Sequence, residues 1–247
     1  MPRPESPAVG RPPEDFAAVL ACDEPLFLVG GQAVNLWALY YRERTADLAP
    51  FVSRDLDVLG DRATLTRIAT LADAKPQFFP MRPPTNEVGV VVAKGTDGQP
   101  LLVEVLAHLH GIANDDLCQP AYTMAIGQSG VHVRLPGPIA LLQAKIANVA
   151  DLSQTGRQDG RHVRILAQLM PAYLADVQAT VAAGRVGERA LLGLLERLLK
   201  VVTSSKARHV LSALSVGSRL LFREITAAPP AKVHAFMTRR LARALPE

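Results

Sequence analysis

The sequence predicts an α+β fold, in which a mixed sheet flanked by helices precedes an all-helical C-terminal part. Short apolar segments, separated by turns rich in Gly and Pro, are found up to about residue 137. After Pro136-Gly137-Pro138 the apolar residues have helical spacing. The first residues are rich in Pro, carry both charge signs and lack an apolar run. We therefore expect a disordered tail over 1–14, a core over 15–137 and a helical domain over 138–247.

Charge divides unevenly between these parts. Residues 1–137 carry 11 Lys and Arg against 16 Asp and Glu, a net charge of −5, whereas residues 138–247 carry 16 against 7, a net charge of +9. A basic helical half favours contact with a polyanion, although solvated helix faces would give the same count. No apolar stretch is long enough to predict a membrane span. Two isolated cysteines and the lack of a secretory signal predict a cytoplasmic protein.

The first strand is expected over 26–29, where an apolar run meets Gly30-Gly31. The segment 32–49 contains neither Gly nor Pro, which favours a helix directly after the glycines. Free N–H groups at the start of a helix form an anion site, and glycines let a phosphate approach the backbone closely. A Gly-Gly pair is weak evidence alone, because most such pairs serve only to reverse the chain.

Two carboxylates lie at the start of the second strand, which we expect over 53–59. Because side chains alternate along a strand, Asp55 and Asp57 share one face, about 6.5–7 Å apart, and Arg54 points to the other. Two unit charges near 6 Å repel by about 3 kcal/mol at an effective dielectric near 20. Mg²⁺ would relieve this repulsion, whereas a solvated strand start would tolerate it.

The remaining elements of the core follow from the same patterns. We expect a helix over 62–74, an irregular Pro-rich loop over 76–84, a hairpin of 87–93 with 100–106, and a second hairpin of 121–126 with 131–135. Glu104 is the one charge in the apolar segment 101–106. Buried acids are rarely unpaired, so Glu104 lies either at an exposed sheet edge or beside the two aspartates as a third metal-facing carboxylate.

The helical half is expected to contain five helices, over 138–149, from 159 onwards, and over 191–202, 207–225 and 232–245. Lys145 lies next to the apolar stripe of the first of these helices. A cation in that position either reaches water or meets an anion. Asp159 opens the second helix, with Arg157 and Arg161 on its flank.

Five features occur in chain order. They are Gly-Gly-Gln-Ala at 30–33, Ser53-x-Asp55-x-Asp57, Glu104 on a strand, Lys145 on a helix and Asp159 on the next helix. This arrangement resembles the nucleotidyltransferase superfamily with the DNA polymerase β-like fold, and within it the AbiEii-type toxin branch. The resemblance spans roughly 25–170. It implies a polymerase β-like nucleotidyltransferase core followed by the all-α domain.

The resemblance also implies roles for these residues. The implied catalytic residues and metal ligands are Asp55, Asp57 and Glu104. The implied nucleotide-binding residues are Gly30, Gly31, Ser53, Lys145 and Asp159. In that family a second acid usually follows at the position of His162.

The implied reaction moves a nucleoside monophosphate from a nucleoside triphosphate (NTP) to a hydroxyl acceptor, with two Mg²⁺ ions about 3.5–4 Å apart. The basic helical half favours RNA, such as tRNA, as the acceptor, and the toxin branch implies a cognate antitoxin as partner. A small hydroxyl compound such as an aminoglycoside is the alternative acceptor. The alternative from another class is a nucleotide-binding or interaction protein that has this fold without turnover.

Overall fold

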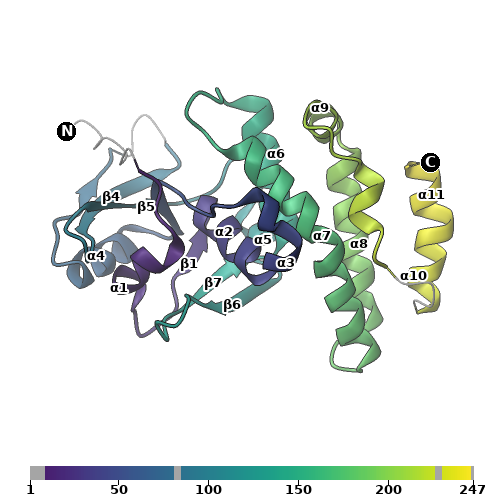
Figure 1. Cartoon of the computed structure of the whole chain (residues 1–247), viewed down its shortest axis with the longest axis horizontal. Coiled ribbons are helices and arrows are strands. Elements are labelled where there is room, and N and C mark those ends of the chain that lie inside the picture. The colour runs from purple at the N-terminus through teal and green to yellow at the C-terminus, as the bar shows by residue number, and fades with distance from the viewer. Residues whose placement is uncertain (1–8, 81–84, 226–229, 246–247) are drawn as a thin grey trace.

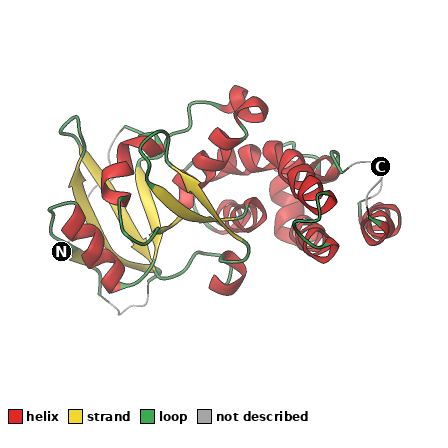
Figure 2. Cartoon of the chain, turned by 90° about the horizontal axis from the view of Figure 1, so that it is seen from below, coloured by secondary structure: helices red, strands yellow, loops and turns green. Residues whose placement is uncertain are grey.

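A computed structural model describes residues 9–80, 85–225 and 230–245. Within these residues, seven strands form one mixed sheet at one end of the molecule, and the last helices lie at the other end (Figures 1 and 2). The strands are β1 (Phe27–Val29), β2 (Asp55–Leu59), β3 (Gln77–Phe78), β4 (Glu87–Lys94), β5 (Pro100–Leu106), β6 (Ala121–Ala125) and β7 (His132–Pro136). The predicted α+β class is confirmed.

The strand order is β3-β4-β5-β2-β1-β7-β6. Two pairs in the middle are parallel, β2 with β5 and β1 with β7, and the other neighbours are antiparallel. Both predicted hairpins, β4 with β5 and β6 with β7, are present. The strand β2, which begins with Asp55, therefore lies near the centre of the sheet, between β1 and β5.

The helices in the described part of the chain are α1 (Ala17–Leu20), α2 (Gly30–Tyr40), α3 (Arg42–Thr45), α4 (Arg62–Leu71), α5 (Asn114–Leu117), α6 (Pro138–Asp151), α7 (Asp159–Ala182), α8 (Glu188–Thr203), α9 (Ser205–Ala213), α10 (Ala231–Ala235) and α11 (Ala242–Ala244). A π-helical segment, Phe236–Leu241, joins the last two. No described helix combines the length and the apolar character needed to cross a membrane.

Alternation along the strands gives the sheet two different faces. Leu28, Leu56 and Val103 belong to the large core, into which α2 and α4 also pack. Val29 and Leu106 point the other way, into a smaller apolar cluster with residues of α5 and α6. Polar strand residues of the same parity as this second set therefore face α6.

The structure corrects three predicted elements. The helix expected over 32–49 begins at Gly30 and ends at Tyr40, and the Thr45 hydroxyl beyond it donates to the Ala38 carbonyl. The Pro-rich segment 76–84 contains the short strand β3, and its residues 81–84 lie outside the described part. The helix expected over 207–225 ends at Ala213, and a 3₁₀ turn, Ser218–Phe222, follows.

The described end of the predicted tail contacts the core. The backbone of Arg11 exchanges hydrogen bonds with that of Ser53, at 2.8 and 2.9 Å, and the Gln32 side chain donates to the Arg11 carbonyl at 2.9 Å. The expected disorder over 1–14 is therefore wrong from Arg11 onwards, because this backbone is paired. Residues 1–8 lie outside the described part.

The expected boundary at 137/138 marks a change in element type and not in packing. The helices α6 and α7 pack against each other and against α2. One hydrophobic core runs from Phe16 to Leu241. A site built where α2, α6 and the sheet meet therefore draws on residues from both sides of the boundary.

Candidate functional site

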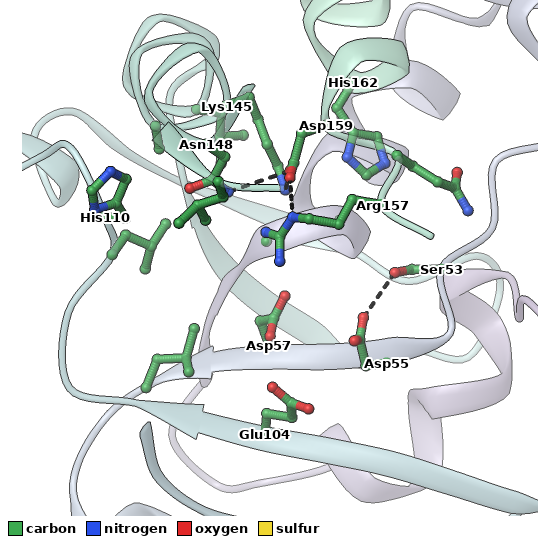
Figure 3. A pocket seen from close by; sticks show the side chains of 18 of the residues that line it. Ser53, Asp55, Asp57, Glu104, His110, Lys145, Asn148, Arg157, Asp159 and His162 are labelled. Atoms are coloured by element: carbon green, nitrogen blue, oxygen red, sulfur yellow. Dashed lines mark hydrogen bonds and ion pairs between the residues drawn. The ribbon is translucent and has the colours of Figure 1, made fainter. Parts of the chain in front are cut away.

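A cleft of about 290 Å³ opens between β2, β5, α6 and the start of α7 (Figure 3). All eight residues singled out in the sequence line it, namely Gly30, Gly31, Ser53, Asp55, Asp57, Glu104, Lys145 and Asp159. They come from segments up to 129 residues apart, and the fold brings them together. The carboxylates form one side of the cleft, and a cluster around Lys145 forms the opposite side.

The three carboxylates lie on the sheet face that points toward α6. Asp55 and Asp57 alternate with buried Leu56, as strand geometry requires. Glu104 is the residue opposite Asp57 on the parallel strand β5. It is only 4 % exposed and β5 has a neighbour on each side, so the alternative of an exposed sheet edge is excluded.

Electrostatic repulsion is concentrated at Asp57. Its pKa is raised well above the usual range, first by burial and then by the charges of Asp55 and Glu104. Lys145 and the backbone N–H of Gly31 oppose this rise. The Asp55 carboxylate accepts a hydrogen bond from the Ser53 hydroxyl at 3.0 Å. Burial and the two neighbouring charges thus disfavour the charged form of Asp57 more than Lys145 and the Gly31 N–H favour it.

Carboxylate oxygens are the donors that Mg²⁺ prefers, so the donor set fits this ion. In their present positions, however, no three His, Cys, Asp or Glu side chains of the described residues are arranged to hold a metal ion.

The two glycines are the first residues of α2, and each is required by a close approach. Gly30 has φ +65°, and a Cβ there would lie 1.7 Å from Oδ2 of Asp57. A Cβ on Gly31 would lie 2.7 Å from the Ser53 hydroxyl. The start of α2 therefore sits directly against the β2 carboxylates, and the Gly31 N–H is already engaged by Asp57.

A charged cluster forms the opposite side of the cleft. Asp159, which is 2 % exposed, accepts hydrogen bonds from Lys145 Nζ at 2.8 Å, Arg157 Nε at 2.6 Å and Asn148 Nδ2 at 3.3 Å. Burial alone would raise the pKa of Asp159, but Lys145 and Arg157 outweigh it and hold the pKa at about 2. Both carboxylate oxygens are occupied, so Asp159 positions the two cations.

Arg54 does not behave as strand alternation suggested. It precedes the first residue of β2, so the alternation of that strand does not fix its direction. Its guanidinium donates to the Gly156 carbonyl at 2.5 Å, in the loop before α7, and it lines the cleft. A further cation thus lies at the rim near Asp55.

His162 also lines the cleft, at the position where the family that the chain resembles usually has a second acid. It is 4 % exposed, and neither ring nitrogen has a hydrogen-bond partner among the described residues. Its pKa is lowered well below the usual value, first by burial and then by Lys145, so the ring is neutral at pH 7. Its Cε1 lies 3.2 Å from where a Gly31 Cβ would be.

Comparisons with known proteins give little further information. No family model matches the chain, and no curated protein matches it. Among solved structures, that of JHP933 from Helicobacter pylori is similar at 16 % sequence identity, over 94 % of this chain and 90 % of that one, with a TM-score of 0.36. A likeness at this TM-score carries no weight for either the fold family or the function.

Proposed function

We propose that this chain is a Mg²⁺-dependent nucleotidyltransferase with a polymerase β-like core, which moves a nucleoside monophosphate from an NTP to a hydroxyl acceptor. The observation that carries the proposal is the position of Asp55, Asp57 and Glu104. They face one cleft from two adjacent strands, at the glycine start of a helix. Asp57 is disfavoured in its charged form by burial and by the charges of Asp55 and Glu104, and a bound cation would relieve this.

The metal ligands would be Asp55 and Asp57, with Glu104 as the third. Bound Mg²⁺ would neutralise the triphosphate and orient it for an in-line displacement. Asp57 is anchored for this role by the Gly31 N–H, and Ser53 holds Asp55 at the mouth of the cleft.

The chain's own residues would bind and position the reactants. Lys145 and Arg157, fixed by Asp159, place two positive charges across the cleft from the acids, where triphosphate oxygens would lie. Glycines at 30 and 31 allow a phosphate to approach the backbone.

In the transfer step, the acceptor hydroxyl oxygen forms a bond to the α-phosphorus and the bond to pyrophosphate breaks. The hydroxyl proton passes to a carboxylate, for which Glu104 is the candidate, or to water. The acceptor is RNA, with tRNA as the favoured kind, because residues 138–247 carry a net charge of +9. A small hydroxyl compound such as an aminoglycoside is the alternative. The chain would act as the toxin of a toxin–antitoxin pair, with the antitoxin as its protein partner.

The proposal is tested with the four NTPs labelled at the α-phosphate, Mg²⁺ and total RNA. Label should enter RNA, whereas label at the γ-phosphate should not, because the γ-phosphate leaves with pyrophosphate. Asp57→Asn should abolish transfer. Asp73→Asn is the matched control, because Asp73 is an exposed turn residue with φ 46°, a conformation that Asn also tolerates.

A second candidate function is nucleotide binding without turnover. It is favoured by one observation, the lack of a ready three-residue metal site in the described part of the chain. Binding of NTPs without label transfer to RNA or to aminoglycosides would support this candidate over the transferase.

A further inference from the structure

A second hollow is lined by residues of α8, α9, the π-helical segment and α11. These elements lie at the opposite end of the molecule from β4 (Figure 1). The volume of this hollow is about 710 Å³. Its charged lining consists of Lys200, Arg208, Arg239, Arg240, Arg243 and the single acid Glu196. We call this hollow the basic groove. It shares no lining residue with the carboxylate cleft.

Most of the positive charge in the basic groove is unpaired. Arg240 forms an ion pair with Glu196. The other four cations form no ion pair within the part of the chain that the structure describes, and all four are exposed. Four like charges around one hollow repel one another, and a polyanion would relieve that repulsion.

Local helix stability does not explain this arrangement. Val233, Phe236 and Leu241 of the C-terminal segment are buried, which directs Arg239 and Arg243 outward. Because these two are four residues apart on a helical segment, their charges oppose each other locally. Arg239 and Arg243 therefore do not stabilise their helical segment through each other, and binding of an external anion would account for their placement.

We propose that the basic groove binds the phosphate backbone of the acceptor RNA, at a distance from the reacting end. Arginine presents a planar fork of donors that matches phosphate geometry, and phosphate contacts position a nucleic acid without reading its sequence. The apolar lining residues are few, and Leu199 is only 5 % exposed, so the groove lacks the apolar core typical of a protein interface and an apolar edge for lipid.

This inference rests on the proposed function in that the bound RNA is the acceptor. Because α8 and α11 lie on the far side of α7 from the sheet (Figure 1), an RNA that contacts both sites has to extend across the helical half. Binding of a short oligonucleotide that fills only the cleft should therefore not depend on the residues of the basic groove.

The test compares two double variants of the full chain that change net charge equally. Arg239→Gln with Arg243→Gln alters the groove, and Arg185→Gln with Arg189→Gln removes two exposed arginines that lie outside it. Binding of unfractionated tRNA is measured by fluorescence anisotropy between 0.05 and 0.3 M salt, values that span about a twofold change in Debye length. Thermal unfolding checks that both variants fold.

The groove variant should bind tRNA about ten- to thirtyfold more weakly near 0.1 M salt, and its slope of log K against log salt should be shallower by about 1.4, for two lost phosphate contacts. The control variant should stay within about twofold of the native chain. Equal losses of tRNA affinity in the two variants would overturn the proposal. Native tRNA affinity in the groove variant would also overturn it, whether or not this variant loses binding to polyglutamate, the probe for an acidic protein partner.

The outcome is separable from that of the proposed function. Asp57→Asn should lose label transfer and keep tRNA affinity, whereas the groove variant should keep NTP binding. Absence of label transfer by the native chain would count against the transferase, while the tRNA comparison would still decide the role of the groove.

Discussion

Replacing Asp57 by Asn should abolish nucleotidyl transfer and at the same time stabilise the metal-free protein. Asp57 stands beside Glu104 in the register of β2 and β5 and shares a face with Asp55. Its raised pKa shows that its charged form is disfavoured in the folded state. Asn has the same shape and its oxygen can still accept the Gly31 N–H, so the substitution removes the cost of burying a charge and the repulsion from Asp55 and Glu104.

The magnitude follows from the spacing. Paired residues on neighbouring strands are about 4.8 Å apart at Cα, and residues two apart on one strand about 6.5–7 Å. Charges near 6 Å repel by about 3 kcal/mol at an effective dielectric near 20, and Lys145 offsets part of this. We expect a net gain in unfolding free energy on the order of 1–3 kcal/mol, at about 2–4 °C in Tm for each kcal/mol.

The sign of the pH dependence is fixed by the raised pKa. The folded state binds the proton more tightly, so the wild-type chain loses stability as pH rises from the unfolded pKa through the folded one. The gain in unfolding free energy from Asp57→Asn should therefore be small near pH 4 and grow toward pH 8.

Thermal unfolding in EDTA at several pH values, with Asp73→Asn as the control, measures this difference. A Tm for Asp57→Asn several degrees below that of the control at pH 8 would refute the reasoning, because Asp57 would then be a structural residue. Added Mg²⁺ should raise the Tm of the native chain and leave Asp57→Asn unchanged.

Three further predictions concern the walls of the cleft. His162→Leu should leave Tm unchanged or raise it, since buried nitrogens without partners cost about 1–3 kcal/mol each. The same variant should raise the KM for NTP in the transfer assay, because the ring lies beside Gly31 in the cleft. A drop in Tm would show that the ring is structural. Asp159→Asn should lower the unfolding free energy by about 2–4 kcal/mol in urea titrations, because buried Lys145 loses its charged partner. The native chain should lose this stabilisation as pH falls from about 4 toward the Asp159 pKa of about 2. An unchanged urea midpoint in Asp159→Asn would show that the ion pair does not stabilise the fold. Gly30→Ala should abolish transfer and destabilise the fold far more than Gly130→Ala. Gly130 has a similar positive φ, but a Cβ placed there would have no atom within 4 Å. Equal unfolding midpoints of the two variants would show that a Cβ at residue 30 does not clash with Asp57.

The sequence was sufficient to predict the part of the site that depends on local geometry. Asp55 and Asp57 share a face because strand side chains alternate, and that rule needs no tertiary information. The anomaly of a charge inside an apolar strand drew attention to Glu104. Glu104 lies beside the aspartates and not at an exposed sheet edge because β5 is placed between β4 and β2. The sequence of a single strand does not indicate its partner when the pairing is long-range.

The remaining features arise only from packing. The Asp159 carboxylate is occupied by Lys145 and Asn148, which are 14 and 11 residues away on another helix. Only its third partner, Arg157, is a neighbour in the sequence. The unpartnered ring of His162 becomes visible only when α7 packs on α2. Arg54 turned toward the cleft because Gly156 offers it a carbonyl, a contact between residues 102 positions apart.

The central claim is that the three acids hold divalent metal beneath a triphosphate. Equilibrium dialysis tests it most directly, with Mn²⁺ as a spectroscopic substitute for Mg²⁺ and with α,β-methylene analogues of the four NTPs, comparing the native chain with Asp57→Asn and Asp73→Asn. We predict that the native chain and Asp73→Asn concentrate Mn²⁺ together with an analogue, and that Asp57→Asn does not. Equal metal uptake by all three proteins, or none by the native chain, would contradict the claim.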